Sequence, residues 1–263
     1  MKKCFQIFFF LCSAFFFSCE TNSKRKEETH IQGLIADSGM VVSAHPEASK
    51  VGLRILQKGG NAVDAAVAVQ FALAVVYPNA GNIGGGGFMV LRMNNGEINS
   101  LDFREKAPMK ASRDMYLNKD GNVIPKLSTD GLLSVGVPGS VDGMMRAHAR
   151  YGELPWKDLI QPAIDLAEKG FSITERQANE LHEIRDFFLK QNDSAYFLSL
   201  VKFTKLDWKS GDTLIQKELA ETLKLIRDNG REGFYSGKTA DNIVKEMKRG
   251  NGIISLEDLK NYE

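Results

Sequence analysis

The chain has 263 residues, a formal net charge of +1 and 43% hydrophobic residues. The balanced charge lacks the basic surplus with which proteins bind nucleic acid, so we expect no nucleic-acid partner. The hydrophobic share is too high for a disordered chain. This length is enough to bury a real core in one large domain or two small ones.

The N-terminus has the composition of a signal peptide. A basic start precedes a mostly apolar stretch of thirteen residues, 5–17, which is shorter than the about 20 that a transmembrane helix needs. Cys19 then follows a small residue, which resembles a bacterial lipobox, although Phe16 stands where Leu is usual. We expect residues 1–18 to be removed and Cys19 to carry a lipid. An ordinary secretory signal cleaved nearby is the alternative.

The next segment, 19–38, is polar and charged, and we expect a solvated tether between a membrane anchor and the body at 39–263. All three cysteines precede residue 20, so the body has no disulfide framework. Loss of the two leader lysines changes its formal charge from +1 to −1. The protein is thus expected to be an exported lipoprotein that faces the periplasm or the cell exterior.

The body is predicted to begin with a short strand at 40–42, followed by two helices. The first starts at Pro46, places its apolar residues on one face and ends at the glycine pair 59–60. Asn61 is a good N-cap for the second helix, 62–76, which is apolar nearly all round. Such a helix must be buried, and it is too short to span a bilayer.

Four consecutive glycines, 84–87, follow the second helix. Glycine runs serve positive φ angles or close backbone approach. A dinucleotide-binding loop has a strand before it and a helix after it. Here the order is reversed, so we reject that interpretation. The Asn-Gly pair at 95–96 predicts a hairpin that joins strands at 88–93 and 98–103.

Arg104 stands at the end of the second strand, with Asp102 and Glu105 beside it. It is either a solvated edge charge or a guanidinium that grips a carboxylate with two parallel hydrogen bonds. Spacing alone does not decide between these. Beyond it we expect a short strand entering a turn at 132–140, an irregular stretch at 192–212, and helices at 141–151, 156–169, 174–190, 218–228, 239–248 and 256–262.

Other chemistries find little support in the sequence. The Gly-Lys-Thr at 237–239 resembles the end of a P-loop, but position 232 is Glu where that motif needs its first glycine, and no apolar strand precedes it. We interpret it as a turn that starts a helix. The four histidines are scattered without zinc-ligand spacing, and no nucleophile-elbow motif occurs. We therefore expect neither a metal nor an organic cofactor.

Taken together, the motifs are more specific than any of them alone. Their ordered set resembles the large-subunit part of bacterial gamma-glutamyltranspeptidases, also called glutathione hydrolases, from about Gly39 to the last residue. The matching segments are GMVVSA at 39–44, GGNAVDAAVA at 59–68, PNAGNIGGGGFM at 78–89, DFREKAP at 102–108, VPG at 137–139, QPA at 161–163, GF at 170–171, GDTL at 211–214, FYSG at 234–237 and DLKNY at 258–262.

The resemblance implies an α+β fold, the αββα sandwich of N-terminal-nucleophile hydrolases, of which this chain supplies the helix-rich N-terminal part. In that family the precursor cleaves itself before a threonine, whose hydroxyl is the nucleophile and whose α-amine is the base. The γ-glutamyl group passes from glutathione or a similar compound to water, an amino acid or a peptide. The implied partners are these substrates and the protein's own small subunit.

The resemblance also implies that Arg104 holds the α-carboxylate of the γ-glutamyl group, which suits its rigid planar fork. We hypothesise that Asp102 and Glu105 fix its rotamer. Thr129 and Thr174 stand in no matching context, so no catalytic residue is expected among the 263. The chain alone is then inactive and exposes core surface. The alternative is a lipid-anchored binding protein that keeps the fold without the chemistry.

Overall fold

The computed structural model describes residues 33, 35–190 and 207–263. The predicted signal peptide and Cys19 lie outside the described residues, as does most of the stretch 192–212. Contacts divide the chain into 1–38 and 39–263, and the elements below all belong to the second unit. Among the described residues, no helix is both long enough and apolar enough to cross a membrane.

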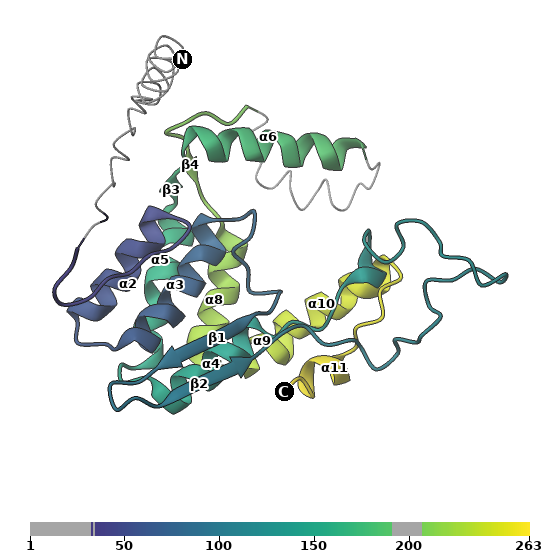
Figure 1. Cartoon of the computed structure of the whole chain (residues 1–263). Helices are drawn as coiled ribbons and strands as arrows, with labels where there is room; N and C mark the ends of the chain where they lie inside the picture. The colour runs from purple at the N-terminus through teal and green to yellow at the C-terminus, as the bar shows by residue number, and fades with distance from the viewer. Residues whose placement is uncertain (1–32, 34, 191–206) are drawn as a thin grey trace, which may run out of the picture. The chain divides into compact units, whose positions relative to one another are not determined.

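Helices make up most of the described body, and the strands form two short antiparallel pairs (Figure 1). The helices are α2 (Pro46–Gln57), α3 (Ala62–Val76), the 3₁₀ helix η2 (Leu132–Ser134), α4 (Ser140–Tyr151), α5 (Trp156–Lys169), α6 (Glu175–Lys190), α8 (Lys217–Asn229), α9 (Glu232–Tyr235), α10 (Gly237–Arg249) and α11 (Leu256–Lys260). The strands are β1 (Phe88–Arg92) paired with β2 (Ile98–Asp102), and β3 (Phe171–Ser172) paired with β4 (Thr213–Leu214).

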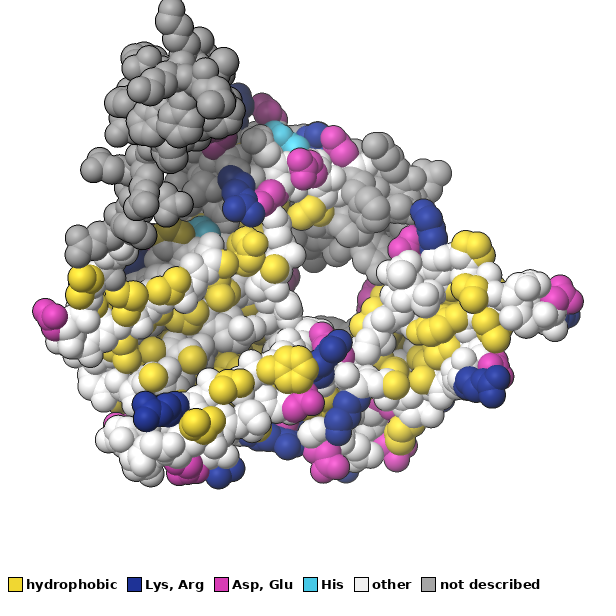
Figure 2. Space-filling view, viewed as in Figure 1, with side chains coloured by type: hydrophobic (Ala, Val, Ile, Leu, Met, Phe, Trp, Pro, Cys, Tyr) yellow, Lys and Arg dark blue, Asp and Glu magenta, His cyan; other side chains and the backbone are white. Residues whose placement is uncertain are grey.

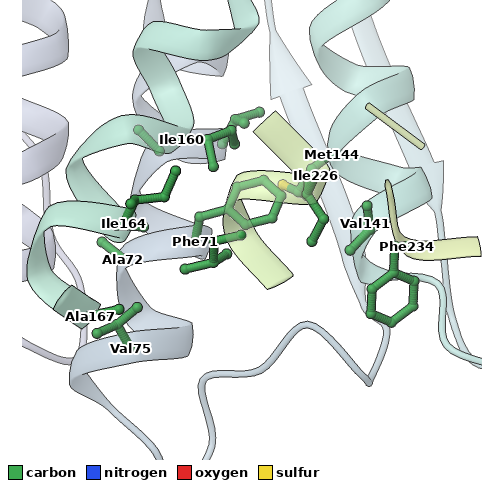
Figure 3. Packing of buried hydrophobic residues seen from close by; sticks show 14 of the residues in the cluster. Phe71, Ala72, Val75, Val141, Met144, Ile160, Ile164, Ala167, Ile226 and Phe234 are labelled. Carbon is green, nitrogen blue, oxygen red and sulfur yellow. The ribbon is translucent and has the colours of Figure 1, made fainter. Parts of the chain in front are cut away.

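The core is built around α3, which packs against α2, α4 and α5, while α5 packs against α8. Figure 3 shows side chains from α3, α4, α5, α8 and α9 meeting in one cluster. Phe71 of α3, Ile160 of α5 and Ile226 of α8 are each at most 1% exposed. The prediction that the apolar helix 62–76 is buried is confirmed, and its bounds agree with the sequence pattern.

The N-terminus of α3 is held by a capping box that also ties down a distant loop. The Asn61 side chain accepts hydrogen bonds from the Val63 and Asp64 N–H groups, and Asp64 accepts one from the Asn61 N–H. The Asp64 carboxylate is fully buried and also accepts from the N–H groups of Glu153 and Leu154, at 3.1 and 3.3 Å. A negative charge at a helix N-terminus is favourable, which helps to offset its burial.

The predicted strand at 40–42 is wrong, and the one within 132–140 is reduced to a single β-bridge between Val137 and Lys106. Residues 40–42 have no strand partner among the described residues; Val41 points toward Gly52 of α2, whereas Val42 is 82% exposed. At 132–134 the chain forms η2, because the positive φ of Gly131 and a hydrogen bond from the Ser134 hydroxyl to its carbonyl favour a turn. The short helix α9 was not anticipated, since four residues show no periodicity.

The predicted hairpin is confirmed, one residue shorter in each strand, with Phe88 opposite Asp102 and Arg92 opposite Ile98. Its side chains alternate between a partly buried and an exposed face. The exposed face carries Phe88, Val90 and Ile98 at 63–77% exposure. Figure 2 shows hydrophobic and basic side chains over this hairpin. The chain thus presents apolar surface of the kind expected of a core that needs a further layer.

A buried carboxylate also fastens the last helix. Asp258 of α11 forms a capping box with Ser255 and accepts a 2.6 Å hydrogen bond from the Met109 N–H, 149 residues away. Burial by itself would raise the pKa of Asp258, but the hydrogen bonds from Met109 and Ser255 lower it below its ordinary value of 3.8. The charged carboxylate is therefore the form that stabilises the fold.

Two leucines test the core. Leu223→Ala on α8, where the side chain is fully buried, should lower the free energy of unfolding by about 2–5 kcal/mol through lost burial and a cavity. Leu53→Ala on α2, where the side chain is 44% exposed, is the matched control and should cost less than about 1 kcal/mol. Urea unfolding measures both, and equal costs would contradict this account of the core.

Asp258→Asn tests the pH dependence. A lowered pKa contributes stability that is present above the unfolded value of 3.8 and is lost as pH falls through the folded value. The wild type should therefore melt at a higher temperature than Asp258→Asn at pH 7, and the gap should close as pH falls below about 4. A gap that is constant between pH 7 and 3 would contradict the assigned charge state.

Candidate functional site

Arg104 lies where three segments meet: the end of β2, the loop that contains the four glycines 84–87 (the glycine loop) and the start of α4. The loop extends the hairpin, because the Gly87 and Phe103 backbones exchange hydrogen bonds of 3.3 and 3.0 Å. The Gly85 carbonyl accepts the N–H groups of Gly139 and Ser140 at 2.7 and 2.9 Å. The glycine loop is thus the bridge between the strand that carries Arg104 and the helix α4.

Close backbone approach explains the glycine at 86. A Cβ there would lie 2.6 Å from the Phe103 carbonyl oxygen, 2.7 Å from the Glu105 nitrogen and 2.8 Å from the Arg104 Cα. Its φ is not positive, so of the two uses of a glycine run, close approach is the one that applies here. By contrast, a Cβ on Gly84 would meet nothing within 4 Å.

The Arg104 guanidinium is open to solvent and to ligands. Its side chain is 65% exposed, with Nε 3.9 Å from a Glu105 carboxylate oxygen and Cζ 5.9 Å from the Phe88 ring centre. An ion pair of this length and exposure contributes little to stability. Within the described residues, no group accepts a hydrogen bond from the guanidinium, so its donors are available for an incoming anion.

The main chain of Arg104, in contrast, is held on both sides. Its N–H donates to a carboxylate oxygen of Asp102 at 3.0 Å, and its carbonyl accepts from the Tyr262 hydroxyl at 2.6 Å. The hypothesis that Asp102 and Glu105 fix the Arg104 rotamer is wrong for Asp102, whose short side chain binds the backbone N–H. Glu105 does reach the guanidinium, at 3.9 Å. Sequence reasoning gave Tyr262 no role, although it belongs to the quoted motif at 258–262.

A buried carboxylate with two partly exposed arginines is linked to this site through Tyr262. Asp142, in the first turn of α4, is 3% exposed and contacts Arg146 at 2.5 Å and Arg231 at 2.8 Å. Arg231 also donates to the Tyr262 carbonyl at 2.6 Å. The Asp142–Arg146 pair has the i,i+4 spacing of a helix surface pair, but the sequence gave no signal for Arg231, which lies 89 positions from Asp142.

Three described threonine hydroxyls and the His45 ring make hydrogen bonds at turns and helix starts. The Thr174 hydroxyl and Gln177 form a cap at the start of α6, and the Thr129 hydroxyl donates to the Lys126 carbonyl. Thr239 is buried in the first turn of α10 and bonds the Gly233 carbonyl, so the P-loop resemblance is indeed a helix start. His45 caps α2. Among the described residues, no group of histidine, cysteine or acidic side chains has the arrangement of a metal site.

Comparison with known proteins identifies the family. The family model for gamma-glutamyltranspeptidase matches residues 48–263. The chain is 50% identical over 230 residues to the glutathione hydrolase proenzyme of Pseudomonas sp. strain A14, and 43% identical over 237 residues to that of Escherichia coli K12. These matches cover 87% and 90% of this chain but only 39% and 40% of the relatives. The chain thus spans about two fifths of their length.

The fold agrees as well. The crystal structure of Helicobacter pylori gamma-glutamyltranspeptidase superposes with a TM-score of 0.82 at 50% identity, covering 88% of this chain and 66% of that one. The chain therefore has the helix-rich N-terminal portion of an N-terminal-nucleophile hydrolase fold, as the sequence motifs implied.

Two glycines of the loop provide the test of the site's geometry. Gly86→Ala should push the loop away from residues 103–105 and lower the free energy of unfolding by about 1–3 kcal/mol, because the clash is with backbone atoms that have no free rotation. Gly84→Ala is the control and should change stability by less than about 0.5 kcal/mol, since its Cβ meets open space. Thermal unfolding of both variants distinguishes them; equal tolerance would contradict the close approach.

Proposed function

The chain belongs to the gamma-glutamyltranspeptidase family, and we propose that the protein of which it forms part transfers γ-glutamyl groups. The donor is glutathione or a related γ-glutamyl compound, and the acceptor is water, an amino acid or a peptide. The similarity to two glutathione hydrolase proenzymes over nearly the whole body supports this proposal.

The observation that carries the proposal within the chain is Arg104. Its guanidinium is exposed and makes no hydrogen bond to the described residues. The Arg104 main chain is held by hydrogen bonds at both its N–H and its carbonyl. The α-carboxylate of a γ-glutamyl group is planar and charged, and a guanidinium binds it with two parallel hydrogen bonds. Anchoring that end of the substrate would orient the γ-carbonyl carbon for attack.

The nucleophile is proposed to be a threonine outside these 263 residues, released by self-cleavage of a precursor. The relatives are named proenzymes, and this chain spans about two fifths of their length. The hydroxyls of Thr129, Thr174 and Thr239 are engaged in hydrogen bonds to their own turns and helix starts, as expected of structural groups. These residues by themselves are accordingly proposed to be inactive.

We also propose that the protein is exported and anchored by a lipid on Cys19. The support is the sequence alone: a basic start, a short apolar stretch and a cysteine behind a small residue. Metabolic labelling with a radioactive fatty acid should mark the wild type and leave Cys19→Ser unlabelled. Equal labelling of both would contradict the assignment, and Cys12→Ser serves as the matched control.

The activity is tested on the protein expressed from the complete reading frame. It should separate into two polypeptides during maturation and release glutamate from glutathione. A single uncleaved chain that binds glutathione without hydrolysing it would instead support a non-catalytic binding protein.

Arg104→Lys tests the assigned role of the guanidinium. Lysine keeps the charge but loses the planar fork, so KM for γ-glutamyl substrates should rise by at least tenfold, while the mature protein should still form. Arg92→Lys, an exposed arginine at the other end of the same hairpin face, is the control and should leave KM unchanged. An unchanged KM in Arg104→Lys would remove this residue from the binding site.

A further inference from the structure

We propose that Tyr262 and Asp102 are positioning residues that fix the main chain of Arg104 and thereby aim its guanidinium at the substrate carboxylate. This inference rests on the proposed function of Arg104. Its basis is that the two polar backbone groups of Arg104 are each bound by a side chain, at 3.0 Å by Asp102 and at 2.6 Å by Tyr262.

The exposed guanidinium needs such support because little else restrains it. Its two neighbours are the Glu105 carboxylate at 3.9 Å and the Phe88 ring at 5.9 Å, and both contacts are at the outer limit of useful interaction. A long side chain on a mobile backbone would lose much conformational freedom on binding a ligand. Fixing the backbone beforehand removes part of that cost.

Tyr262 is itself held rigidly. It is 4% exposed, and its ring stacks on Tyr235 with a centroid separation of 5.8 Å and an interplanar angle of 14°. Tyr235 is 1% exposed and donates its hydroxyl to the Pro138 carbonyl at 2.8 Å. The two rings therefore form a buried stack between the turn before α4 and the backbone of Arg104.

Arg231 connects this stack to the buried Asp142 carboxylate. It lies over the Tyr235 ring at 4.5 Å, donates to the Tyr262 carbonyl at 2.6 Å and pairs with Asp142 at 2.8 Å. Because Arg231 contacts Asp142, the Tyr235 ring and the Tyr262 carbonyl together, it links the position of Tyr262 to α4. The backbone of Arg104 is thus connected through Tyr262 and Arg231 to Asp142 in the first turn of α4.

The Tyr262 hydroxyl fits beside Gly139 because that residue has no side chain. A Cβ on Gly139 would overlap both the Tyr262 hydroxyl and the Phe103 carbonyl. Burial, with the nearby Asp142 and Asp102 charges, raises the pKa of Tyr262 above its ordinary value of 10. The hydroxyl is accordingly a protonated donor at neutral pH, as the hydrogen bond to Arg104 requires.

Tyr262→Phe in the complete, processed protein is the primary test. With a γ-glutamyl anilide as substrate, KM should rise about three- to tenfold, the range for one lost hydrogen bond, while kcat changes less than twofold. Tyr116→Phe is the matched control, because that hydroxyl also donates to a backbone carbonyl, of Leu133 at 3.0 Å, away from Arg104. It should leave KM unchanged.

A second substrate separates positioning from general damage. The 4-aminobutyryl anilide lacks the α-carboxylate, so its kcat/KM should be the same in the wild type and Tyr262→Phe. The preference for the γ-glutamyl anilide should therefore fall by the factor in KM. Equal loss of kcat/KM on both substrates would overturn the proposal, since it would show a structural defect.

Two variants at Asp102 test the positioning role even if Tyr262→Phe does not fold. Asp102→Asn keeps an oxygen that accepts the Arg104 N–H and should retain KM within about twofold, whereas Asp102→Ala should raise it about three- to tenfold. Wild-type KM in Asp102→Ala, or an equal loss in both variants, would overturn the positioning role.

The double variant Arg104→Lys/Tyr262→Phe shows which proposal is at fault. If the fork is already lost, Tyr262→Phe should add less than twofold to KM. An effect of Arg104→Lys without one of Tyr262→Phe would overturn only the positioning role. No effect of Arg104→Lys would overturn the substrate-binding assignment itself.

Discussion

The arrangement of the site depends on how closely the glycine loop approaches its neighbours. At Gly86 the backbone lies against residues 103–105 with no room for a Cβ, and at Gly85 one carbonyl accepts two N–H groups at the start of α4. The loop therefore joins the hairpin to the helical body through close backbone contacts. Because backbone groups cannot change rotamer, this junction sets the position of residues 103–105, Arg104 among them.

Three buried carboxylates hold polar segments that the apolar core does not fix. The core fixes how α3, α5 and α8 lie together, but it cannot hold polar loops. Asp64 binds the N–H groups of residues 153–154, Asp142 pairs with Arg231, and Asp258 binds the Met109 N–H. Each links segments about 90 to 150 positions apart. Such groups add less to stability than to the choice of one arrangement among several, a role in keeping with their burial.

The body presents two kinds of surface at the hairpin. Phe88, Val90 and Ile98 form an exposed apolar face, and Arg104 stands beside it with free donors. An apolar face next to an exposed arginine fits the proposed carboxylate site and a further layer that covers the hairpin. We propose accordingly that this part of the protein binds and orients the substrate, and that a nucleophile from outside these residues reacts with it.

The sequence by itself determined the local structure and the family. The caps and apolar periods of α2, α3 and α5 placed these helices within a residue or two of their observed bounds, and the Asn-Gly pair placed the hairpin. Such signals act between residues a few positions apart, so they can be recognised in the amino-acid sequence. The ordered motifs named the family and pointed to Arg104.

Only the tertiary structure decided what surrounds Arg104. That residues 40–42 pair with no described strand, that Asp102 binds a backbone N–H instead of a guanidinium, and that Tyr262 reaches Arg104 from 158 positions away all depend on packing between distant segments. Periodicity carries no information about such contacts, because they arise from where whole elements are placed. The sequence therefore pointed to Arg104, and the folded chain shows which side chains hold its backbone.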